Sequence, residues 1–277
     1  VHEYGSGSFV VANGSIYFSH FADQRIYRQT LDSQPEPLTP AVDCRYADGI
    51  IDTQRNRLIC VREDHTGEGE AVTTVVSINL ANGADIQILI QGKDFYASPR
   101  LSPDGSKLCW ISWNHPNMPW DGTQLWIAAI NADGDLGEKQ LVAGGLEESI
   151  FQPEWSPDGV LYFVSDKSNW WNIYRTPLNP SLLRGEKDRE PPLLRGAGGI
   201  ESLCEMAAEF GLPQWVFGMS TYAIVSESQI ICTYNRQGLW YLASLDLTTK
   251  KLTTIETPYA DISLVKASGE VAVFLAG

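Results

Sequence analysis

The 277 residues of this chain are enough to bury a large hydrophobic core in one or two domains. The 34 acidic residues outnumber the 20 basic residues, and the formal net charge of −14 argues against a surface that binds nucleic acid or an anionic membrane. No apolar run reaches the roughly 18 residues that a membrane-spanning helix needs, so no membrane span is predicted.

The five cysteines are widely spaced and include no C-x-x-C pair. Cys60, Cys109 and Cys232 fall inside predicted strands, so we expect them to be buried free thiols. Free thiols are typical of a reducing compartment and no signal peptide opens the chain, so the predicted location is the cytoplasm. The chain starts at VHEYGSGSF without Met and stops at VAVFLAG within a predicted strand, so we expect both ends to lie inside a larger protein.

The first two predicted units hold four strands each. Alternating apolar residues, rich in aromatic and β-branched types, mark the strands, and Gly, Asn or Asp residues mark the turns. The first unit spans 1–40 and contains SFVVA, SIYFSHF, RIYRQTL and EPLT. The second unit spans 41–92 and contains CRYADGIID, RLICVRED, TTVVSINL and DIQILIQ.

The third and fourth units share the motif Pro-x-x-Ser-Pro-Asp-Gly, at 99–105 and at 153–159. In each copy the second proline presets φ for a tight turn, the Asp can bond the backbone just ahead, and the Gly accepts a positive φ. Each copy therefore predicts a hairpin. The third unit, 93–145, contains YASPRLS, KLCWISW, TQLWIAAI and KQLVAGG. The fourth, 146–199, contains FQPEWS, VLYFVSD, WNIYRTPL and, after a long charged loop, PPLLR.

The fifth unit spans 200–258 and contains QWVFGMSTYAIVS, QIICTYN, GLWYLASLDL and KLTTIET. A sixth begins at 259–277 with YADISLVKAS and EVAVFLAG. No stretch has a convincing helical period. The best candidate is ESLCEMAAEF at 201–210, where we expect at most a short helix.

Four antiparallel strands repeated about every 50 residues are the signature of a β-propeller. Sandwiches and barrels also contain many short strands, but they lack this four-strand period. The sequence therefore predicts an all-β propeller over 1–277, with about five and a half blades present and truncation at both ends. We expect a parent of about seven blades, and the open strand edge could pair with a second copy of the chain.

Propeller geometry sorts the loops onto two faces. The turns after the first and third strands of each blade share one face and are short, apart from the charged loop NPSLLRGEKDRE. The loops after the second strands and the links between blades share the other face, which we call the linker face. The linker face holds most of the aromatic and acidic loop residues, and loops of this kind on a rigid scaffold usually carry function.

Nine residues of these loops and links are candidate contacts to a substrate or an interface. The loop HPNMPWDG at 115–122 contains two prolines, which stiffen it for docking. Glu147 and Glu148 form a carboxylate pair that could hold the amino terminus of a peptide, and a solvated rim position is the alternative. The nine candidates are His65, His115, Asn117, Met118, Trp120, Asp121, Glu147, Glu148 and Phe210.

The sequence predicts no catalytic residue, metal or cofactor in this chain. The nucleophile motif G-x-S-x-G does not occur, and the nearest stretch, 218–222, ends in Tyr within a predicted strand. His2, His20, His65 and His115 are far apart in sequence, so ordinary polar positions on the rim are favoured over a metal site.

Several phrases resemble the propeller domain of prolyl-oligopeptidase-family serine peptidases, of the bacterial acylaminoacyl-peptidase or dipeptidyl-aminopeptidase type. They are PRLSPDGSKLCWISWNHPNMPWDGTQLW, PEWSPDGVLYFVSDKSNWWNIY and EFGLPQWVFG, with HEYGSGSF and FADQRIY. The resemblance covers essentially the whole chain, and HPNMPWDG and EFGLPQWVFG are its most specific parts. One departure is Ser6, where the family pattern leads us to expect Gly.

The resemblance implies a C-terminal α/β-hydrolase domain that carries the catalytic Ser, Asp and His and that is absent from this chain. It also implies that the propeller covers the active site, docks the hydrolase and admits only short peptides, while being catalytically silent itself. The alternatives are a stand-alone propeller scaffold of the translocation type, which docks a protein partner, and a self-sufficient propeller enzyme. A G-x-S-x-G hydrolase encoded downstream of Gly277 would favour the first reading, and a stop codon would favour the second.

Overall fold

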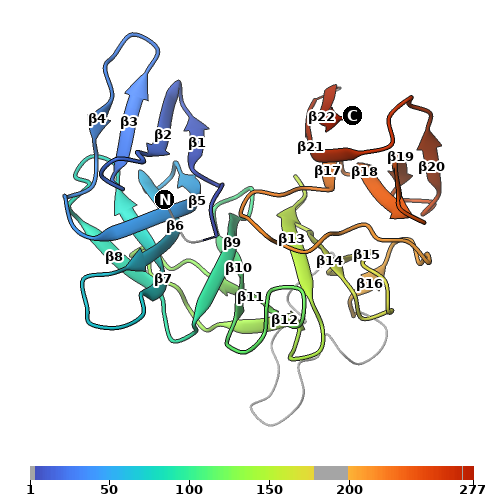
Figure 1. The fold of residues 1–277 in the computed structure, drawn as a ribbon, viewed down its shortest axis with the longest axis horizontal. Coiled ribbons are helices and arrows are strands. Elements are labelled where there is room, and N and C mark those ends of the chain that lie inside the picture. The colour runs from blue at the N-terminus through green and yellow to red at the C-terminus, as the bar shows by residue number, and fades with distance from the viewer. Residues whose placement is uncertain (1–3, 178–198, 270) are drawn as a thin grey trace.

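The structure is a computed structural model that describes residues 4–177, 199–269 and 271–277. Within these residues the strands form five four-stranded sheets and one two-stranded sheet, and every strand pair is antiparallel (Figure 1). Neighbouring strands in each sheet are also consecutive in the chain, so each sheet is a simple meander. The predicted all-β fold of repeated four-stranded sheets is confirmed.

The first three sheets occupy the N-terminal half of the chain. The first consists of β1 (Phe9–Ala12), β2 (Ser15–Ser19), β3 (Ile26–Thr30) and β4 (Glu36–Pro37). The second consists of β5 (Cys44–Asp52), β6 (Arg57–Asp64), β7 (Val72–Asn79) and β8 (Ile86–Ile90). The third consists of β9 (Phe95–Leu101), β10 (Lys107–Trp113), β11 (Gln124–Ala129) and β12 (Gln140–Gly144).

The last three sheets follow in the C-terminal half. The fourth consists of β13 (Ile150–Trp155), β14 (Leu161–Ser165), β15 (Asn172–Arg175) and β16 (Glu201–Ser202). The fifth consists of β17 (Tyr222–Ser226), β18 (Gln229–Arg236), β19 (Leu239–Asp246) and β20 (Leu252–Ile255). The sixth consists of β21 (Ile262–Ser268) and β22 (Val271–Ala276).

The link between the fourth and fifth sheets differs from the sequence prediction. The predicted strand PPLLR lies outside the described residues, and the outer place beside β15 is taken by β16. The rest of 201–210 forms no helix, because its backbone bonds to neighbouring sheets: Met206 N–H donates to Asn172 Oδ1, and Glu209 N–H donates to Asn235 O. The long strand predicted from QWVFGMSTYAIVS begins only at Tyr222.

Both Ser-Pro-Asp-Gly turns form as predicted. Gly105 N–H donates to Ser102 O over 2.8 Å, and Gly159 N–H donates to Ser156 O over 2.9 Å. The two glycines have φ of 64° and 81°, a region in which other residues are strained. The turns join β9 to β10 and β13 to β14, so each motif makes the predicted hairpin.

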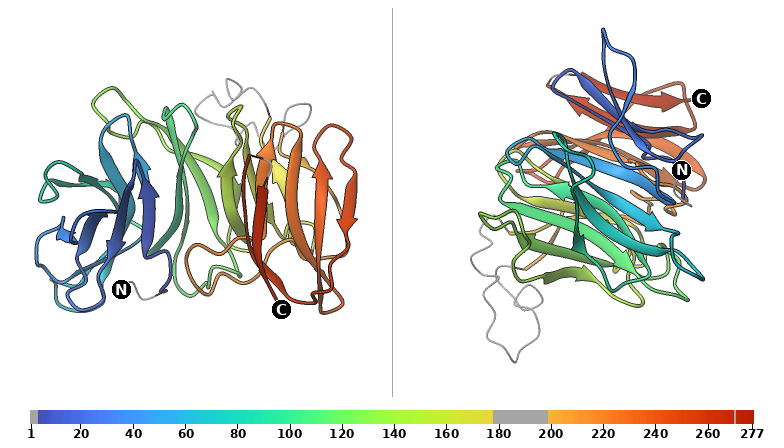
Figure 2. Two further views of the ribbon diagram at one scale, coloured as in Figure 1. Left: turned by 90° about the horizontal axis from the view of Figure 1, so that it is seen from above. Right: turned by 90° about the vertical axis from the view of Figure 1, so that its left-hand side faces the viewer.

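The sheets stand around a common axis with the first strand of each sheet innermost. Contacts between sheets join β1 to β5, β5 to β9, β9 to β13, and β17 to β21. In Figure 1 the sheets follow an arc from blue to red, and the first and last sheets stand on opposite sides at the top; Figure 2 shows the strands running from one face of the arc to the other. Across the axis, Ser6 forms a parallel bridge with Phe217, whose N–H donates to Gly5 O over 3.1 Å.

A β-bulge interrupts the first strand in five of the described sheets. In four of them a bulged residue has a φ near 50°, and these residues are Asp48, Ser98, Gln152 and Leu264. At two of these positions the bulge directs a side chain to the next sheet. Asp48 Oδ2 accepts a bond from Ser98 N–H over 2.6 Å, and Gln152 Oε1 accepts one from Thr221 N–H over 2.7 Å. These bonds fasten neighbouring innermost strands together.

The core lies between the packed sheets. Ile59, Val61, Leu108 and Ile111 are among its fully buried members, as expected for strands covered on both faces. Cys60, Cys109 and Cys232 are buried and free, as predicted. Burial raises the pKa of Cys109 to about 12, so its thiol stays protonated and unreactive near neutral pH.

Candidate functional site

Loops from neighbouring sheets meet on the linker face. Asn117, in the loop after β10, donates from Nδ2 to Leu146 O, in the link after β12, over 2.9 Å. Trp120, from the same loop, has its ring centre 4.3 Å from that of Trp215, which belongs to the link before β17. Segments that are distant in sequence therefore form one continuous surface here.

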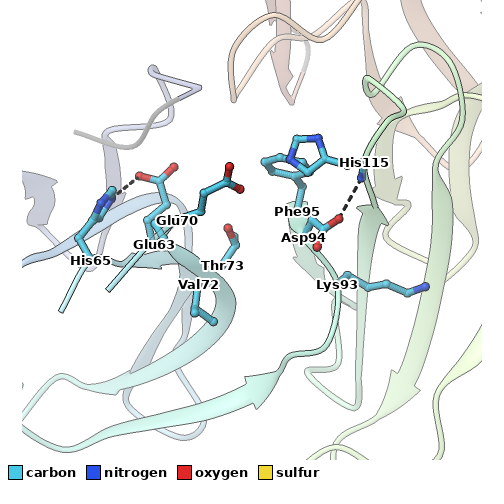
Figure 3. A pocket seen from close by; sticks show the side chains of 11 residues that line it. Glu63, His65, Glu70, Val72, Thr73, Lys93, Asp94, Phe95 and His115 are labelled. Atoms are coloured by element: carbon cyan, nitrogen blue, oxygen red, sulfur yellow. Dashed lines mark hydrogen bonds and ion pairs between the residues drawn. The ribbon is translucent and has the colours of Figure 1, made fainter. Parts of the chain in front are cut away.

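A cavity of about 580 Å³ opens on this face between the second and third sheets (Figure 3). Its volume falls within the roughly 300–1,000 Å³ that is typical of small-molecule sites. The walls carry three carboxylates, two imidazoles, one lysine and one phenyl ring. A site of this size and polarity is suited to a small polar ligand or to part of a peptide.

One wall of the cavity comes from the second sheet. Glu63, near the end of β6, is the cross-strand partner of Thr73 on β7, so the two side chains lie on the same face of the sheet. Both are almost fully buried, with 3% and 6% of their surface exposed. Glu63 Oε2 lies 3.4 Å from His65 Nε2, and the exposed Glu70 points into the cavity beside it (Figure 3).

The opposite wall comes from the third sheet and is largely aromatic. The ring of Phe95, the first residue of β9, stacks on Trp113 at 5.3 Å and meets the His115 ring edge-on at 4.8 Å. Backbone N–H of His115 donates to Asp94 Oδ2 over 2.9 Å, which fixes the start of the loop. The structure thus brings the predicted candidates His65 and His115 to the two sides of one cavity.

A second feature of the linker face is the contact between the rings of Trp120 and Trp215. We use the name tryptophan cluster for these two residues together with the exposed side chains of Met118, in the same loop as Trp120, and of Leu146, whose carbonyl is bonded to that loop. Trp215 and Leu146 leave 62% and 85% of their surface exposed. The predicted candidate Asp121 stabilises the loop that carries Met118 and Trp120, because its Oδ2 accepts a hydrogen bond from Met118 N–H over 2.8 Å. Exposed large apolar side chains gathered on one face are typical of a docking surface.

The adjacent carboxylates Glu147 and Glu148 are in different environments. Glu148 Oε1 accepts a bond from the Ser165 hydroxyl over 2.6 Å, whereas Glu147 is exposed and has no side-chain bond among the described residues. Close by, burial lowers the pKa of Lys167, whose Nζ lies 4.1 Å from the centre of the Tyr174 ring. Of the two, Glu147 is therefore the more accessible to a ligand, whereas Glu148 is tied to β14.

The candidate Phe210 lies in the core and not on the surface. Its side chain has 0% of its surface exposed, and its ring lies 5.5 Å from that of Tyr234. Its N–H donates to Trp171 O over 2.7 Å, so the backbone is also tied to the fourth sheet. This burial does not fit the predicted contact role, and we assign Phe210 to packing between the fourth and fifth sheets.

Sequence reasoning missed Glu63, Thr73 and Phe95 in the cavity and Trp215 in the tryptophan cluster. Strand alternation could have indicated Glu63, because residues 59, 61 and 63 share a face of β6 and the first two are buried apolar residues. Thr73 and Phe95 look like ordinary strand residues, so only the cross-strand register places them at the cavity.

The described residues contain no group of three or more His, Cys, Asp or Glu side chains placed to hold a metal ion. They also contain no helix that is long and apolar enough to cross a membrane.

Two solved peptidases resemble this chain closely. The puromycin-hydrolyzing peptidase of Mycobacterium tuberculosis is 33% identical over 100% of this chain, with a TM-score of 0.87. A mutant puromycin hydrolase complexed with PGG is 32% identical over 95% of it, with a TM-score of 0.83. This chain matches the propeller domain of prolyl-oligopeptidase-family peptidases. The resemblance inferred from the sequence is therefore confirmed.

The propeller spans 42% and 40% of the length of those two peptidases. A putative TolB from Agrobacterium tumefaciens is 12% identical over 87% of this chain and 76% of its own, with a TM-score of 0.55, which is a likeness of fold alone. No family model matches the propeller, and no curated protein matches it.

Proposed function

We propose that this propeller gates substrate access to, and docks onto, the catalytic domain of a cytoplasmic serine peptidase that acts on short peptides. In this proposal the linker face meets an α/β-hydrolase domain of the same parent chain. The propeller itself performs no catalysis. The observation that carries the proposal is the identity above 30%, over nearly the whole chain, to two puromycin-hydrolysing peptidases.

The distribution of side chains supports docking through the linker face. The tryptophan cluster offers an exposed apolar surface, and the neighbouring cavity offers a polar recess. Apolar surface that leaves water on association is the main source of binding free energy in such contacts. The predicted contact residues Trp120, Met118 and Asn117 all belong to the loop that carries this surface.

Selection by size requires only rigid blades around a narrow pore. Close-packed sheets resist deformation, and the bonds from Asp48 and Gln152 hold neighbouring innermost strands together. In this proposal the complete propeller of the parent protein surrounds the pore, which a short peptide could pass and a large folded protein could not. This reasoning supports an oligopeptidase or exopeptidase over a protease of folded proteins.

The alternative function is a stand-alone scaffold that docks a protein partner. It rests on the fold likeness to TolB, at 12% identity. The two functions differ in what the gene encodes after Gly277: a hydrolase with G-x-S-x-G supports the peptidase, and a stop codon supports the scaffold.

The activity test compares the full-length protein with residues 1–277 alone. The substrates are puromycin and aminoacyl or peptidyl p-nitroanilides, with and without a serine-directed inhibitor. We expect inhibitor-sensitive turnover by the full-length protein and none by residues 1–277. Turnover by residues 1–277 that resists the inhibitor would instead indicate a self-sufficient propeller enzyme, and inactivity of both would contradict the proposal.

The docking test replaces Trp215 in the full-length protein. Because Trp215 is 62% exposed, Trp215→Ala should leave the folding stability of the propeller nearly unchanged while lowering kcat/KM by weakening the domain contact. Leu31→Ala is the matched control, because Leu31 is also exposed and lies in the turn after β3, on the other face. Equal kcat/KM values for the two variants would argue against docking at the tryptophan cluster.

A further inference from the structure

A second, smaller pocket lies between the second and third sheets on the face opposite the linker face, where the turns after the first and third strands lie. We call it the turn-face pocket. Its volume is about 210 Å³, below the roughly 300–1,000 Å³ of sites for drug-sized ligands, so it suits one small molecule. None of its lining residues is aromatic, and most are polar or charged, so a ligand would be recognised here through hydrogen bonds.

Two sheets supply the walls of the turn-face pocket. Arg57, the first residue of β6, is the cross-strand partner of Asn79 on β7. Ser77, also on β7, is the partner of Gln87 on β8. Cross-strand partners and alternate residues of a strand share a face, so these four side chains form one wall. The other wall is the turn after β11 in the third sheet, where Gly134 O accepts a bond from Arg57 Nη1 over 2.8 Å.

Arg57 gives a second, independent indication of a ligand. It is 5% exposed, and its Nε donates to Asp52 Oδ2 over 2.9 Å. Its Nη2 is also buried but has no hydrogen-bond partner among the residues that the structure describes. Buried polar groups are normally paired, and an unpaired nitrogen on a charged group is especially costly. In a residue that lines a pocket, this unpaired nitrogen indicates an acceptor from outside the chain.

The charges around the turn-face pocket do not favour a simple ion. The buried Asp52 carboxylate lies 2.9 Å from Arg57 Nε and 3.1 Å from Arg55 Nη1, so it already offsets one of the two guanidinium charges. An anion attracted by the remaining charge would meet the exposed carboxylates of Asp85 and Asp133, which also line the pocket. A cation attracted by those carboxylates would leave Arg57 Nη2 without an acceptor.

A neutral ligand with neighbouring hydroxyl groups matches both kinds of side chain. A guanidinium only donates hydrogen bonds and a carboxylate only accepts them, whereas a hydroxyl does both. One hydroxyl of such a ligand would accept a bond from Arg57, and the next would donate a bond to Asp85. The Ser77 hydroxyl, which also lines the pocket, can bond to a further hydroxyl in either direction.

We propose that the turn-face pocket binds a small neutral polyol, either a monosaccharide or a cyclitol, through a hydrogen bond from Arg57 and one to Asp85. Bound there, the polyol would bridge the second and third sheets. This proposal does not rest on the proposed peptidase function, because the pocket lies on the face opposite the one assigned to docking.

Saturation-transfer NMR on the full-length protein tests the site, because this method detects weak ligands through their own proton signals. D-glucose is the sugar probe, myo-inositol is the cyclitol probe, and tetrahydropyran is a similar ring without hydroxyls. We expect saturable transfer to at least one of the two polyols and none to tetrahydropyran. Transfer to glucose alone identifies a sugar as the ligand, and transfer to myo-inositol alone identifies a cyclitol. Inorganic phosphate should displace neither polyol.

Two substitutions locate the site without threatening the fold, because both residues are exposed. Asp85→Ala removes a charged acceptor and should weaken polyol binding about tenfold. Ala132→Phe adds bulk to the wall of the pocket and should weaken binding at least several-fold. The matched controls are Asp32→Ala and Ala41→Phe, which change an exposed carboxylate and an exposed alanine outside the pocket and should leave binding unchanged.

The proposal is overturned if neither polyol receives saturation, if tetrahydropyran binds as well as the polyols, or if Asp85→Ala and Ala132→Phe bind polyol as their controls do. Displacement of the polyol by inorganic phosphate would also overturn it, because the pocket would then select an anion.

Discussion

Arg100, on β9, joins carboxylates from the two neighbouring sheets. Its Nη1 lies 3.1 Å from Asp48 Oδ1 on β5, and its Nε lies 3.6 Å from Glu154 Oε1 on β13. Burial lowers the pKa of Arg100, but the two carboxylates raise it by more, so the guanidinium stays charged. Asp48 is itself 5% exposed and depends on this cation for compensation of its charge.

Replacing Arg100 should therefore destabilise the propeller. We expect Arg100→Met to lower the free energy of unfolding by about 2–4 kcal/mol, because it leaves the Asp48 carboxylate buried without its cation. Urea denaturation measures the change. Arg236→Met, at an exposed position at the end of β18, is the control and should change the stability by less than about 0.5 kcal/mol. A loss for Arg100→Met no larger than that of the control would contradict the structural role.

Asp104, in the first Ser-Pro-Asp-Gly turn, should make stability depend on pH. Hydrogen bonds from the Ser102 and Ser106 hydroxyls and from Ser106 N–H lower the pKa of Asp104 to about 2, from an ordinary value of 3.8. The folded pKa lies below the unfolded one, so the stabilisation is complete above about pH 4 and is lost as the pH falls through 2.

Thermal melts of the wild type and of Asp104→Asn between pH 6 and pH 2 test this dependence. The wild type should be more stable at pH 6, and the difference should shrink as the pH falls below about 4. Asp32→Asn is the control, because the exposed Asp32 carboxylate accepts no hydrogen bond from the described residues. A difference between wild type and Asp104→Asn that stays constant with pH would speak against the turn as its source.

Single residues of the cavity were only partly predictable from the sequence. His65 and His115 were predicted because they lie in polar loops, where a His is conspicuous. Glu63 and Thr73 lie within strands, and their places depend on which residues face each other across β6 and β7. That register is set by pairing along the whole hairpin, so no local pattern reveals it.

At the scale of elements, hairpins were predictable and bulges were not. Pro103, Asp104 and Gly105 each restrict the backbone of their own turn, so the turn can be read from adjacent residues. Four of the bulges place a residue at positive φ without a glycine to mark it, and these residues are Asp48, Ser98, Gln152 and Leu264. Contacts with the next sheet, such as Asp48 to Ser98, fix two of these conformations, and those contacts join residues far apart in the chain.

The end of β12 contains two adjacent glycines that should respond differently to substitution. A Cβ on Gly144 would lie 1.9 Å from Thr123 O, and φ there is 89°, whereas a Cβ on Gly145 would meet nothing within 4 Å. We expect Gly144→Ala to cost at least about 2–3 kcal/mol of unfolding free energy and Gly145→Ala to be nearly neutral. Chemical denaturation of both variants measures this, and equal stabilities would show that the link after β12 adapts freely.

At the scale of the whole molecule, the arc of sheets leaves apolar surface uncovered at both ends. On β22, Val271, Val273 and Leu275 are each about 60% exposed, and on β1, Phe9 and Val11 are similarly exposed. Alternate residues of a strand share a face, so each of these sets forms an apolar stripe. Uncovered stripes and open strand edges favour association with other chains.

We therefore predict that residues 1–277 self-associate at high concentration. Sedimentation velocity over a series of concentrations should reveal dimers or larger species. Val273→Lys, which places a charge in the stripe on β22, should shift the distribution toward monomer, and Lys251→Arg, at an exposed position outside it, should not. A monomer at every concentration, or dimers unaffected by Val273→Lys, would contradict edge-mediated association.

The number and order of the sheets could be derived from the period of the sequence, because each sheet is a local meander of consecutive strands. How the sheets are fastened across the centre could not, because those contacts join the two halves of the chain. Tyr4 illustrates this: its ring lies 5.6 Å from that of Trp113 and 5.7 Å from that of Phe217.

The bridge between Ser6 and Phe217 joins the two halves of the chain at the centre of the arc. Because the segment ahead of the first sheet is bonded directly to the segment ahead of the fifth, the first four sheets are linked at both ends of their arc. Spreading any two neighbouring sheets within this set would also have to break the bridge between Ser6 and Phe217. A passage through the middle could therefore widen only in a concerted step, and slow exchange of the Phe217 amide with solvent deuterium would be its signature.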